Sequence, residues 1–419
     1  MIDLMLNWSE WIKPSAGLPT VQWSLLLAVA AAAGHLLQRY LGLPKVLGYS
    51  AIGALAGFSG YTTASWPLTG VGQFMVELGL SIVLFEAGGR LTLRWFRHNP
   101  MLLMQSLGEA IATYLAAWWV LQLFGVDESL HVPLALLLVA TSPTVLMRVA
   151  ADLRASGPVT ERAITLAALN TFYVLALGGV MARLLGRSPA KLADAIYPVI
   201  LLVVASILVG ALLALALRKA LQLMSPTSEN TAVLQLALIA AGTALAANFG
   251  GSAPLAALLA GILLKTLHPR PWSWPRQFGT ASAILTILMF VLVSMAAAQA
   301  AWDWQAWRLI AALVLARALA KLAAVSLAGF GSGASPKQAL WTACAMWPMS
   351  AVALLLVSQF TEFAPMIGRP VAAIALPLIL FMEVLGALMA VLALQRAGEA
   401  GRPPAIRRAK PEGENTDAA

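Results

Sequence analysis

Apolar runs close to the ~20 residues that cross a bilayer recur thirteen times along this 419-residue chain. Sixty per cent of the residues are hydrophobic and only 11% are charged, and the mean hydropathy is +0.82. Soluble globular domains do not sustain such a composition over this length. The sequence therefore predicts an all-α polytopic membrane protein with about thirteen transmembrane helices.

The predicted spans divide as six, one and six. This division gives a first repeat over 20–185, a linker helix over 193–217 and a second repeat over 229–395 with inverted topology. Residues 1–19 form an N-terminal external segment, and residues 396–419 form a short basic tail without regular structure. The thirteen runs are 20–39, 44–62, 69–90, 100–124, 131–150, 157–185, 193–217, 229–249, 252–267, 277–299, 304–329, 337–360 and 370–395.

Charge fixes the expected orientation. The formal net charge is +9, and most of the 27 Lys and Arg residues fall on the cytoplasmic side when the N-terminus is outside and the tail is inside. This distribution indicates orientation in a bilayer and no nucleic-acid partner. The single cysteine, Cys344, excludes an intrachain disulfide, and no metal or other cofactor is expected.

Two spans are interrupted at matching positions. Span five contains Thr141, Ser142 and Pro143 at its midpoint, and span twelve, the fifth of the second repeat, contains Pro348 and Ser350. Proline removes a backbone donor and clashes with the preceding turn, so both helices should break. Broken backbone at that depth is tolerated only where it lines a protein-enclosed or watery cavity. The breaks predict a transport site at the midplane.

Few ionisable side chains lie deep in the predicted spans. Arg317 and Lys321 are four residues apart in span eleven and share one helical face. Glu109 lies near the middle of span four, and Glu383 near the middle of span thirteen. Because an unpaired charge is costly at that depth, two charges of each sign predict mutual pairing.

Four further residues within the predicted spans can be assigned a role from their position. Asn170 and Thr171 lie at the midpoint of span six and are expected to line the same cavity. Glu86 is four residues before Arg90, which favours a structural ion pair, with a charge-partner role in transport as the alternative. Gly53, with a second glycine four residues on, predicts close helix packing in span two.

Four motifs resemble those of bacterial monovalent cation:proton antiporters of the sodium/hydrogen exchanger superfamily, in the branch that contains Kef-type and Nap-type exchangers. The motifs are residues 41–49 (LGLPKVLGY), 77–88 (ELGLSIVLFEAG), 140–144 (ATSPT) and 250–261 (GGSAPLAALLAG). The resemblance implies an inner-membrane homodimer with a mobile core of spans three to five and ten to twelve, with span six. This core would move against a dimerising scaffold in an elevator-type cycle.

The resemblance also implies a site, from which this sequence departs. Members of the family carry one or two acidic residues in span six, where cation and proton compete, and Asn170 and Thr171 occupy those positions here. The family's span-eleven lysine is similar to Lys321. Thr141 and Ser142 are similar to its broken-helix ligands.

Three functions remain open. In the first, the protein is a secondary transporter, not an enzyme, and exchanges Na⁺ or K⁺ for protons. Either Lys321 carries the proton, or Glu109 or Glu383 supplies the missing carboxylate. Arg317 would then act as a fixed counter-charge. In the second, the cationic residues and half-helix N-termini serve an anion. The third is a membrane-embedded sensor or scaffold without transport. If Glu109 and Glu383 both face the cavity, cation transport is favoured over anion transport.

Overall fold

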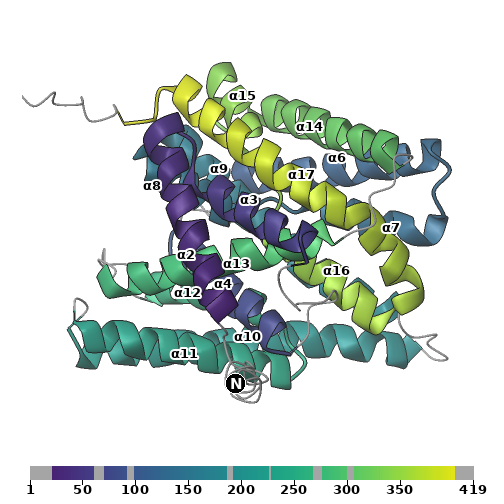
Figure 1. Cartoon of the computed structure of the whole chain (residues 1–419). Helices are drawn as coiled ribbons and strands as arrows, with labels where there is room; N and C mark the ends of the chain where they lie inside the picture. The colour runs from purple at the N-terminus through teal and green to yellow at the C-terminus, as the bar shows by residue number, and fades with distance from the viewer. Residues whose placement is uncertain are drawn as a thin grey trace, which may run out of the picture.

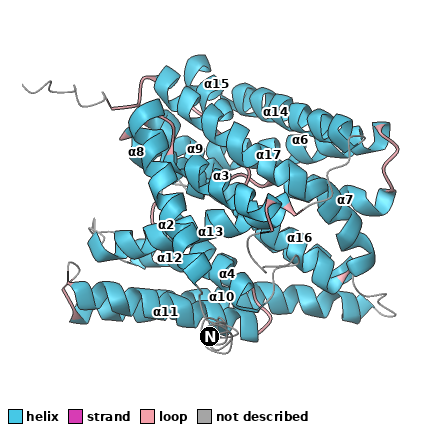
Figure 2. Ribbon diagram, in the orientation of Figure 1, coloured by secondary structure: helices cyan, strands magenta, loops and turns pink. Residues whose placement is uncertain are grey.

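The computed structural model describes residues 21–60, 70–91, 99–185, 192–225, 228–267, 276–299, 306–329 and 331–401. These residues form helices and connecting turns, with no strand among them (Figures 1 and 2). The predicted external segment 1–19 lies outside the described residues, and the predicted tail is described only as far as Gly401.

The helices follow the predicted spans closely. Each apolar run coincides with one helix, or with two half-helices where a break was predicted. The helices are α2 (Val21–Leu36), extended by a π-helical turn (Leu37–Leu41), α3 (Lys45–Phe58), α4 (Gly70–Gly88), α6 (Pro100–Leu123), α7 (Glu128–Val139), α8 (Pro143–Leu153), α9 (Pro158–Leu185), α10 (Leu192–Leu223), α11 (Glu229–Asn248), α12 (Ala253–Leu267), α13 (Arg276–Ala298), α14 (Ala306–Gly329), α15 (Pro336–Ala345), α16 (Ala351–Phe363) and α17 (Pro365–Ala397).

Length and composition suit these helices to a bilayer. Among the described residues, nine helical segments are long and apolar enough to cross a membrane, one of them the broken pair α7 and α8 taken together. Three further apolar helices are shorter, namely α3, α12 and α16. Large apolar side chains are exposed along the outer helices, as a lipid-facing surface requires. The predicted all-α membrane fold is confirmed.

Spans five and twelve are broken, as predicted. In span five, α7 ends at Val139 and α8 begins at Pro143, whose missing N–H needs no partner at the first helical position. The Ser142 hydroxyl accepts a hydrogen bond from the Val145 N–H and so caps α8. In span twelve, the Ser350 hydroxyl caps α16 in the same way. Local sequence therefore produces two half-helix pairs.

Helices pack most extensively within two groups. We call α6–α9 and α14–α17 the site bundle, and α2–α4 and α10–α13 the flanking bundle. In Figure 1, α10 and α11 of the flanking bundle lie along the lower edge, and α14 and α15 of the site bundle lie near the upper edge. Packing of α6 on α14, α3 on α13 and α4 on α12 is the pattern that two inverted repeats would produce. The division into repeats itself stays a prediction.

The composition of these bundles corrects one expectation. Spans three and ten were expected in the core with the broken helices, but α4 and α13 pack mainly in the flanking bundle. Small residues are the physical reason. A side chain at Gly88 of α4 would lie 2.3 Å from the Leu258 carbonyl oxygen of α12, and one at Gly53 of α3 would lie 2.5 Å from the Val291 carbonyl oxygen of α13. Close packing at Gly53 is thus confirmed.

The end of α17 is fastened to the start of α9. The Glu399 carboxylate accepts hydrogen bonds from the N–H groups of Val159 and Thr160, each over 2.7 Å, and from the Thr160 hydroxyl over 2.6 Å. A carboxylate is well suited to the partly positive N-terminus of a helix. Gly401 N–H also donates to the Leu153 carbonyl at the end of α8. The C-terminal turn therefore holds three helices of the site bundle together.

Candidate functional site

The two broken stretches, residues 140–142 and 346–350, touch one another inside the site bundle. The Ser142 N–H donates to the Pro348 carbonyl over 3.0 Å. The partly negative carboxyl ends of α7 and α15 and the partly positive amino ends of α8 and α16 therefore converge on one region. Such a region needs fixed polar or charged groups to balance it.

Arg317 of α14 balances the carboxyl ends. Its Nε donates to the Leu138 carbonyl over 2.8 Å, and its Nη2 donates to the Ala140 carbonyl over 2.9 Å. Its Nη1 donates to the Trp347 carbonyl in the second break over 2.5 Å. The side chain is only 1% exposed. Arg317 thus joins both breaks through main-chain oxygens, a geometry that suits the fixed fork of a guanidinium group.

Lys321, one turn further along α14, pairs with Glu109 of α6. Its Nζ donates to Glu109 Oε1, and both side chains have no exposed surface. The same carboxylate oxygen accepts a hydrogen bond from the Thr113 hydroxyl over 3.0 Å. Burying both charges is tolerable because each is paired and hydrogen-bonded.

Asn170 of α9 completes the cluster around this pair. Its Nδ2 donates to Glu109 Oε2 over 2.6 Å and to the Thr141 hydroxyl over 3.2 Å. Lys321 Nζ also donates to the Thr141 hydroxyl, over 2.9 Å. The contact with Glu109 fixes the orientation of the amide, because an ionised carboxylate only accepts hydrogen bonds and must therefore face the amide nitrogen and not its oxygen. The buried Asn170 Oδ1 has no hydrogen-bond partner among the described residues.

Thr171 faces the first break. Its hydroxyl lies 3.0 Å from the Thr141 carbonyl oxygen and 2.9 Å from the Ala167 carbonyl oxygen. One hydroxyl hydrogen is shared between these acceptors, so Thr171 fastens α9 to the broken stretch of span five. Glu109, Thr141, Asn170, Thr171 and Lys321 therefore form one buried cluster, which we call the ion-pair cluster, bordered by Ser142 and Arg317.

The expected mutual pairing of four charges is right for one pair and wrong for the other two residues. Glu109 pairs with Lys321, whereas Arg317 binds main-chain carbonyls. Glu383 is not part of the ion-pair cluster, because its face of α17 turns toward α13, where its carboxylate accepts a hydrogen bond from the Ser294 hydroxyl. Only one of the two candidate carboxylates therefore reaches Asn170.

The expected pair of Glu86 and Arg90 is also wrong. Arg90 lies in the turn that follows α4, so the four-residue helical spacing does not extend to it. Its Nη1 instead lies 3.8 Å from Oε1 of Glu161 on α9. Both of these side chains are exposed, so the pair contributes little stability. Glu86 is partly buried and forms no ion pair with any described residue.

Sequence reasoning missed several contributors to the site. Thr113 is four residues after Glu109 and on the same face of α6, so its position was a usable signal. The carbonyl groups that bind Arg317 carry no signal in residue type. Only the predicted breaks could have suggested that main-chain oxygens lie unpaired there.

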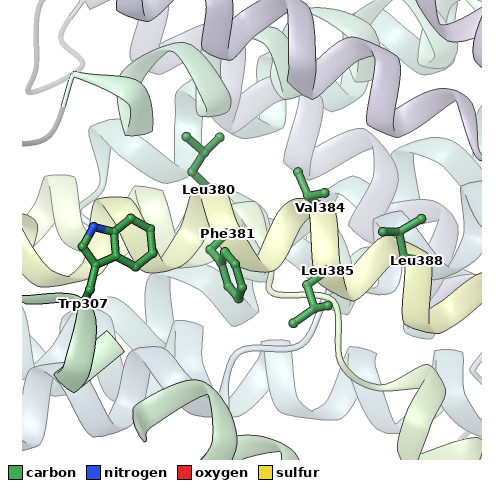
Figure 3. Close-up of a pocket in the computed structure, with 6 residues that line it drawn as sticks. All are labelled: Trp307, Leu380, Phe381, Val384, Leu385 and Leu388. Carbon is green, nitrogen blue, oxygen red and sulfur yellow. The ribbon is translucent and has the colours of Figure 1, made fainter. Parts of the chain in front are cut away.

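An apolar groove shares no lining residue with the ion-pair cluster. Figure 3 shows Trp307 of α14 beside five side chains of α17, namely Leu380, Phe381, Val384, Leu385 and Leu388. The groove has a volume of about 310 Å³ and no polar lining side chain apart from the indole. It offers no group to hold an ion.

Crossed half-helices with a buried ion pair at the crossing define a class of polytopic secondary carriers. Comparison with known families narrows this class. A family model described as "Sodium/hydrogen exchanger, transmembrane" matches residues 25–395, and the chain belongs to this family of transporters.

Solved structures show the same fold. The structure of the sodium proton antiporter MjNhaP1 from Methanocaldococcus jannaschii at pH 8 is similar with a TM-score of 0.66 and 17% identity, over 90% of this chain and 98% of that chain. An electron-microscopy structure of MjNhaP1 is similar with a TM-score of 0.67 and 16% identity, over the same shares. A comparison with curated protein sequences gives no significant match. Family and fold together support a cation:proton antiporter.

Proposed function

We propose that this protein exchanges Na⁺ or K⁺ for protons, with Glu109 of α6 as the carboxylate that span six lacks. One observation carries the proposal: Glu109 Oε2 lies 2.6 Å from Asn170 Nδ2, so the acid reaches the expected site from a neighbouring helix. The Thr141 hydroxyl accepts hydrogen bonds from Asn170 and from Lys321, so it connects the amide to the lysine that pairs with Glu109. The carboxylate that the sequence lacks in span six, which is α9, would thus be supplied by Glu109 of α6.

The ion-pair cluster can couple the two ions by competition. In the described arrangement, the Lys321 ammonium neutralises the Glu109 carboxylate. A dehydrated Na⁺ or K⁺ prefers oxygen ligands, and Glu109, Thr141 and the unpaired Asn170 Oδ1 offer them. A cation bound there takes the place of the ammonium group, so Lys321 gives up its proton to the water that admitted the cation. One cation enters and one proton leaves.

The two bundles supply a way to move this site. We propose an elevator-type cycle in which the site bundle slides past the flanking bundle, in a bacterial inner membrane, with the N-terminus outside and the C-terminus in the cytoplasm. Two copies would associate through the flanking bundle. Support comes from the packing, which is far more extensive within each bundle than between them.

The anion alternative is less well supported. It requires cationic groups that are free to bind substrate, but Lys321 is paired with Glu109, and Arg317 donates to carbonyl groups of both breaks. The amino ends of α8 and α16 are capped by Ser142 and Ser350. A sensor or scaffold without transport does not require a buried ion pair at the helix crossing.

Reconstituted proteoliposomes test the proposal. With an imposed pH gradient, addition of Na⁺ or K⁺ should dissipate the gradient, as followed with a pH-sensitive dye. E109Q should reduce this signal to that of empty liposomes. E362Q, which alters an exposed acid on α16, is the matched control and should behave as wild type. Equal activity of the two variants would contradict the role of Glu109, and dissipation that depends on the anion would support anion transport.

A further inference from the structure

Glu383 is a buried carboxyl group that the proposed exchange does not use. It lies in α17 and is only 2% exposed. The Ser294 hydroxyl of α13 donates to its Oε2. Ser50 of α3 lies beside the same carboxyl, and the buried Ser50 hydroxyl has no hydrogen-bond partner among the described residues. The carboxyl therefore faces two hydroxyl groups, each from a different helix of the flanking bundle.

No described charge neutralises Glu383. Neighbouring helices do carry charged or titratable side chains, but these side chains contact other groups. Arg317 and Lys321 of α14 bind carbonyl groups and Glu109, Arg148 of α8 donates to Ser282 and Thr286, Asp152 of α8 pairs with Lys45 of α3, and His131 of α7 bonds the Val126 carbonyl. Tyr49 of α3, Tyr173 of α9, Cys344 of α15 and the exposed Glu362 of α16 form no hydrogen bond or ion pair with Glu383 in the structure.

An ionised carboxylate in this position would be a bare buried charge. Such a charge is strongly unfavourable unless a cation or several donors compensate it. The neutral acid avoids this cost. With Ser294 donating to Oε2, a proton on Oε1 could be donated to the Ser50 hydroxyl, which would then gain a partner. Deep burial without a compensating cation therefore favours the protonated form, and the single hydroxyl donor Ser294 offsets only part of this preference.

The position of Glu383 couples this proton to movement. Glu383 belongs to the site bundle, whereas Ser294 and Ser50 belong to the flanking bundle. Its hydrogen bonds therefore cross the boundary at which the two bundles would slide. When the bundles shift, the carboxyl group must exchange its hydroxyl partners for new neighbours or for water.

We infer that Glu383 is a second proton-binding site, separate from the ion-pair cluster, whose proton holds α17 against α13 and α3 and is released when this boundary opens. The ligand is H⁺ itself. The packed form binds the proton and the opened form releases it, so low pH favours the packed form and rising pH favours opening. The movement rests on the proposed function, whereas proton binding in the packed form does not.

Infrared spectroscopy of the purified protein tests proton binding without any transport. The carbonyl band of a protonated carboxyl group should be present at about pH 7, where an unperturbed glutamate is ionised. It should be lost in E383Q and retained in E109Q. S294A, a smaller change, should shift the band because the acid loses a hydrogen bond. Identical wild-type and E383Q spectra in this region, or an unshifted band in S294A, would overturn the inference.

Transport assays test the coupling to movement. E383Q mimics the neutral acid at every pH, so it should exchange ions at the wild-type rate at about pH 6 and lack the wild-type increase toward about pH 9, by up to about tenfold for each pH unit of release. A wild-type pH profile in E383Q would contradict the coupling. If the infrared band is found in a protein that shows no cation-driven exchange, the proton site stands and the proposed function fails.

Discussion

Two buried carboxylates, 274 positions apart in the chain, lie in contrasting surroundings. Glu109 is held by a lysine, an amide and a threonine hydroxyl beside two broken helices. Glu383 is held by a serine hydroxyl between two intact helices, with no cationic partner among the described residues. The same side chain is therefore suited to a charged role in one region and to a neutral role in the other. Both carboxylates lie near the middle of their spans, so depth does not distinguish them. The direction in which each helix face points does.

The largest expected effect comes from moving the Glu109 carboxylate. E109Q should reduce exchange at least about 100-fold, since the competing charge is lost. Adding N170D should restore exchange to within about tenfold of wild type, because the carboxylate and the amide then trade places across the same 2.6 Å hydrogen bond. Cation-driven proton flux in proteoliposomes measures both variants. An inactive double variant with wild-type folding would show that the carboxylate must come from α6.

Breaking the ion pair should cost stability as well as transport. K321A leaves the Glu109 carboxylate buried without its cation, and the free energy of unfolding should fall by about 3–5 kcal/mol. The double variant E109Q/K321A should recover much of this loss, because no buried charge remains. Denaturant unfolding of the purified protein gives the three values. Additive losses would argue against the pair.

Arg317 offers an intermediate effect. R317K keeps the positive charge but cannot serve carbonyl groups of both breaks at once, so we expect a loss of about 2–3 kcal/mol in the free energy of unfolding. Exchange should fall with it, because the half-helices lose their common anchor. The same unfolding assay applies. Wild-type stability in R317K would mean that charge alone, and not the fork of donors, balances the helix ends.

Glu383 should show the smallest effect on stability. E383Q preserves shape and hydrogen bonding while removing the ionisable group, so the free energy of unfolding at about pH 7 should change by less than about 1 kcal/mol. K321A is the comparison, because it changes a buried group that is charged. A loss as large as that of K321A would indicate that Glu383 is ionised and paired, and the contrast between the two carboxylates would disappear.

Much of the fold could be predicted because its signals are local. Apolar length placed the helices, and Pro143 and Pro348 placed the breaks, since each acts on its own turn of backbone. The choice between Glu109 and Glu383 could not be predicted, because it depends on how α6 and α17 are rotated. A contact distant in sequence sets that rotation for α17: a side chain at Gly386 would lie 2.4 Å from the Pro348 Cα.

The same limit explains the error over spans three and ten. Their membership of the flanking bundle depends on backbone contacts such as Gly88 with Leu258, which join segments 170 residues apart. Hydrophobic periodicity reports which residues are buried and not which helix buries them. The main-chain partners of Arg317 were hidden for a related reason, because every residue type carries the same carbonyl group.

Glu399 links the movement of α9 to that of α17. Because this residue clamps the first turn of α9 to the end of α17, the helix that bears Asn170 and the helix that bears Glu383 share a common pivot. Neither helix can tilt alone without breaking the three hydrogen bonds that Glu399 accepts. Any displacement that carries the Asn170 amide across the bilayer must also carry the Glu383 carboxyl past Ser294, so the two side chains would move together through the contact that Glu399 makes.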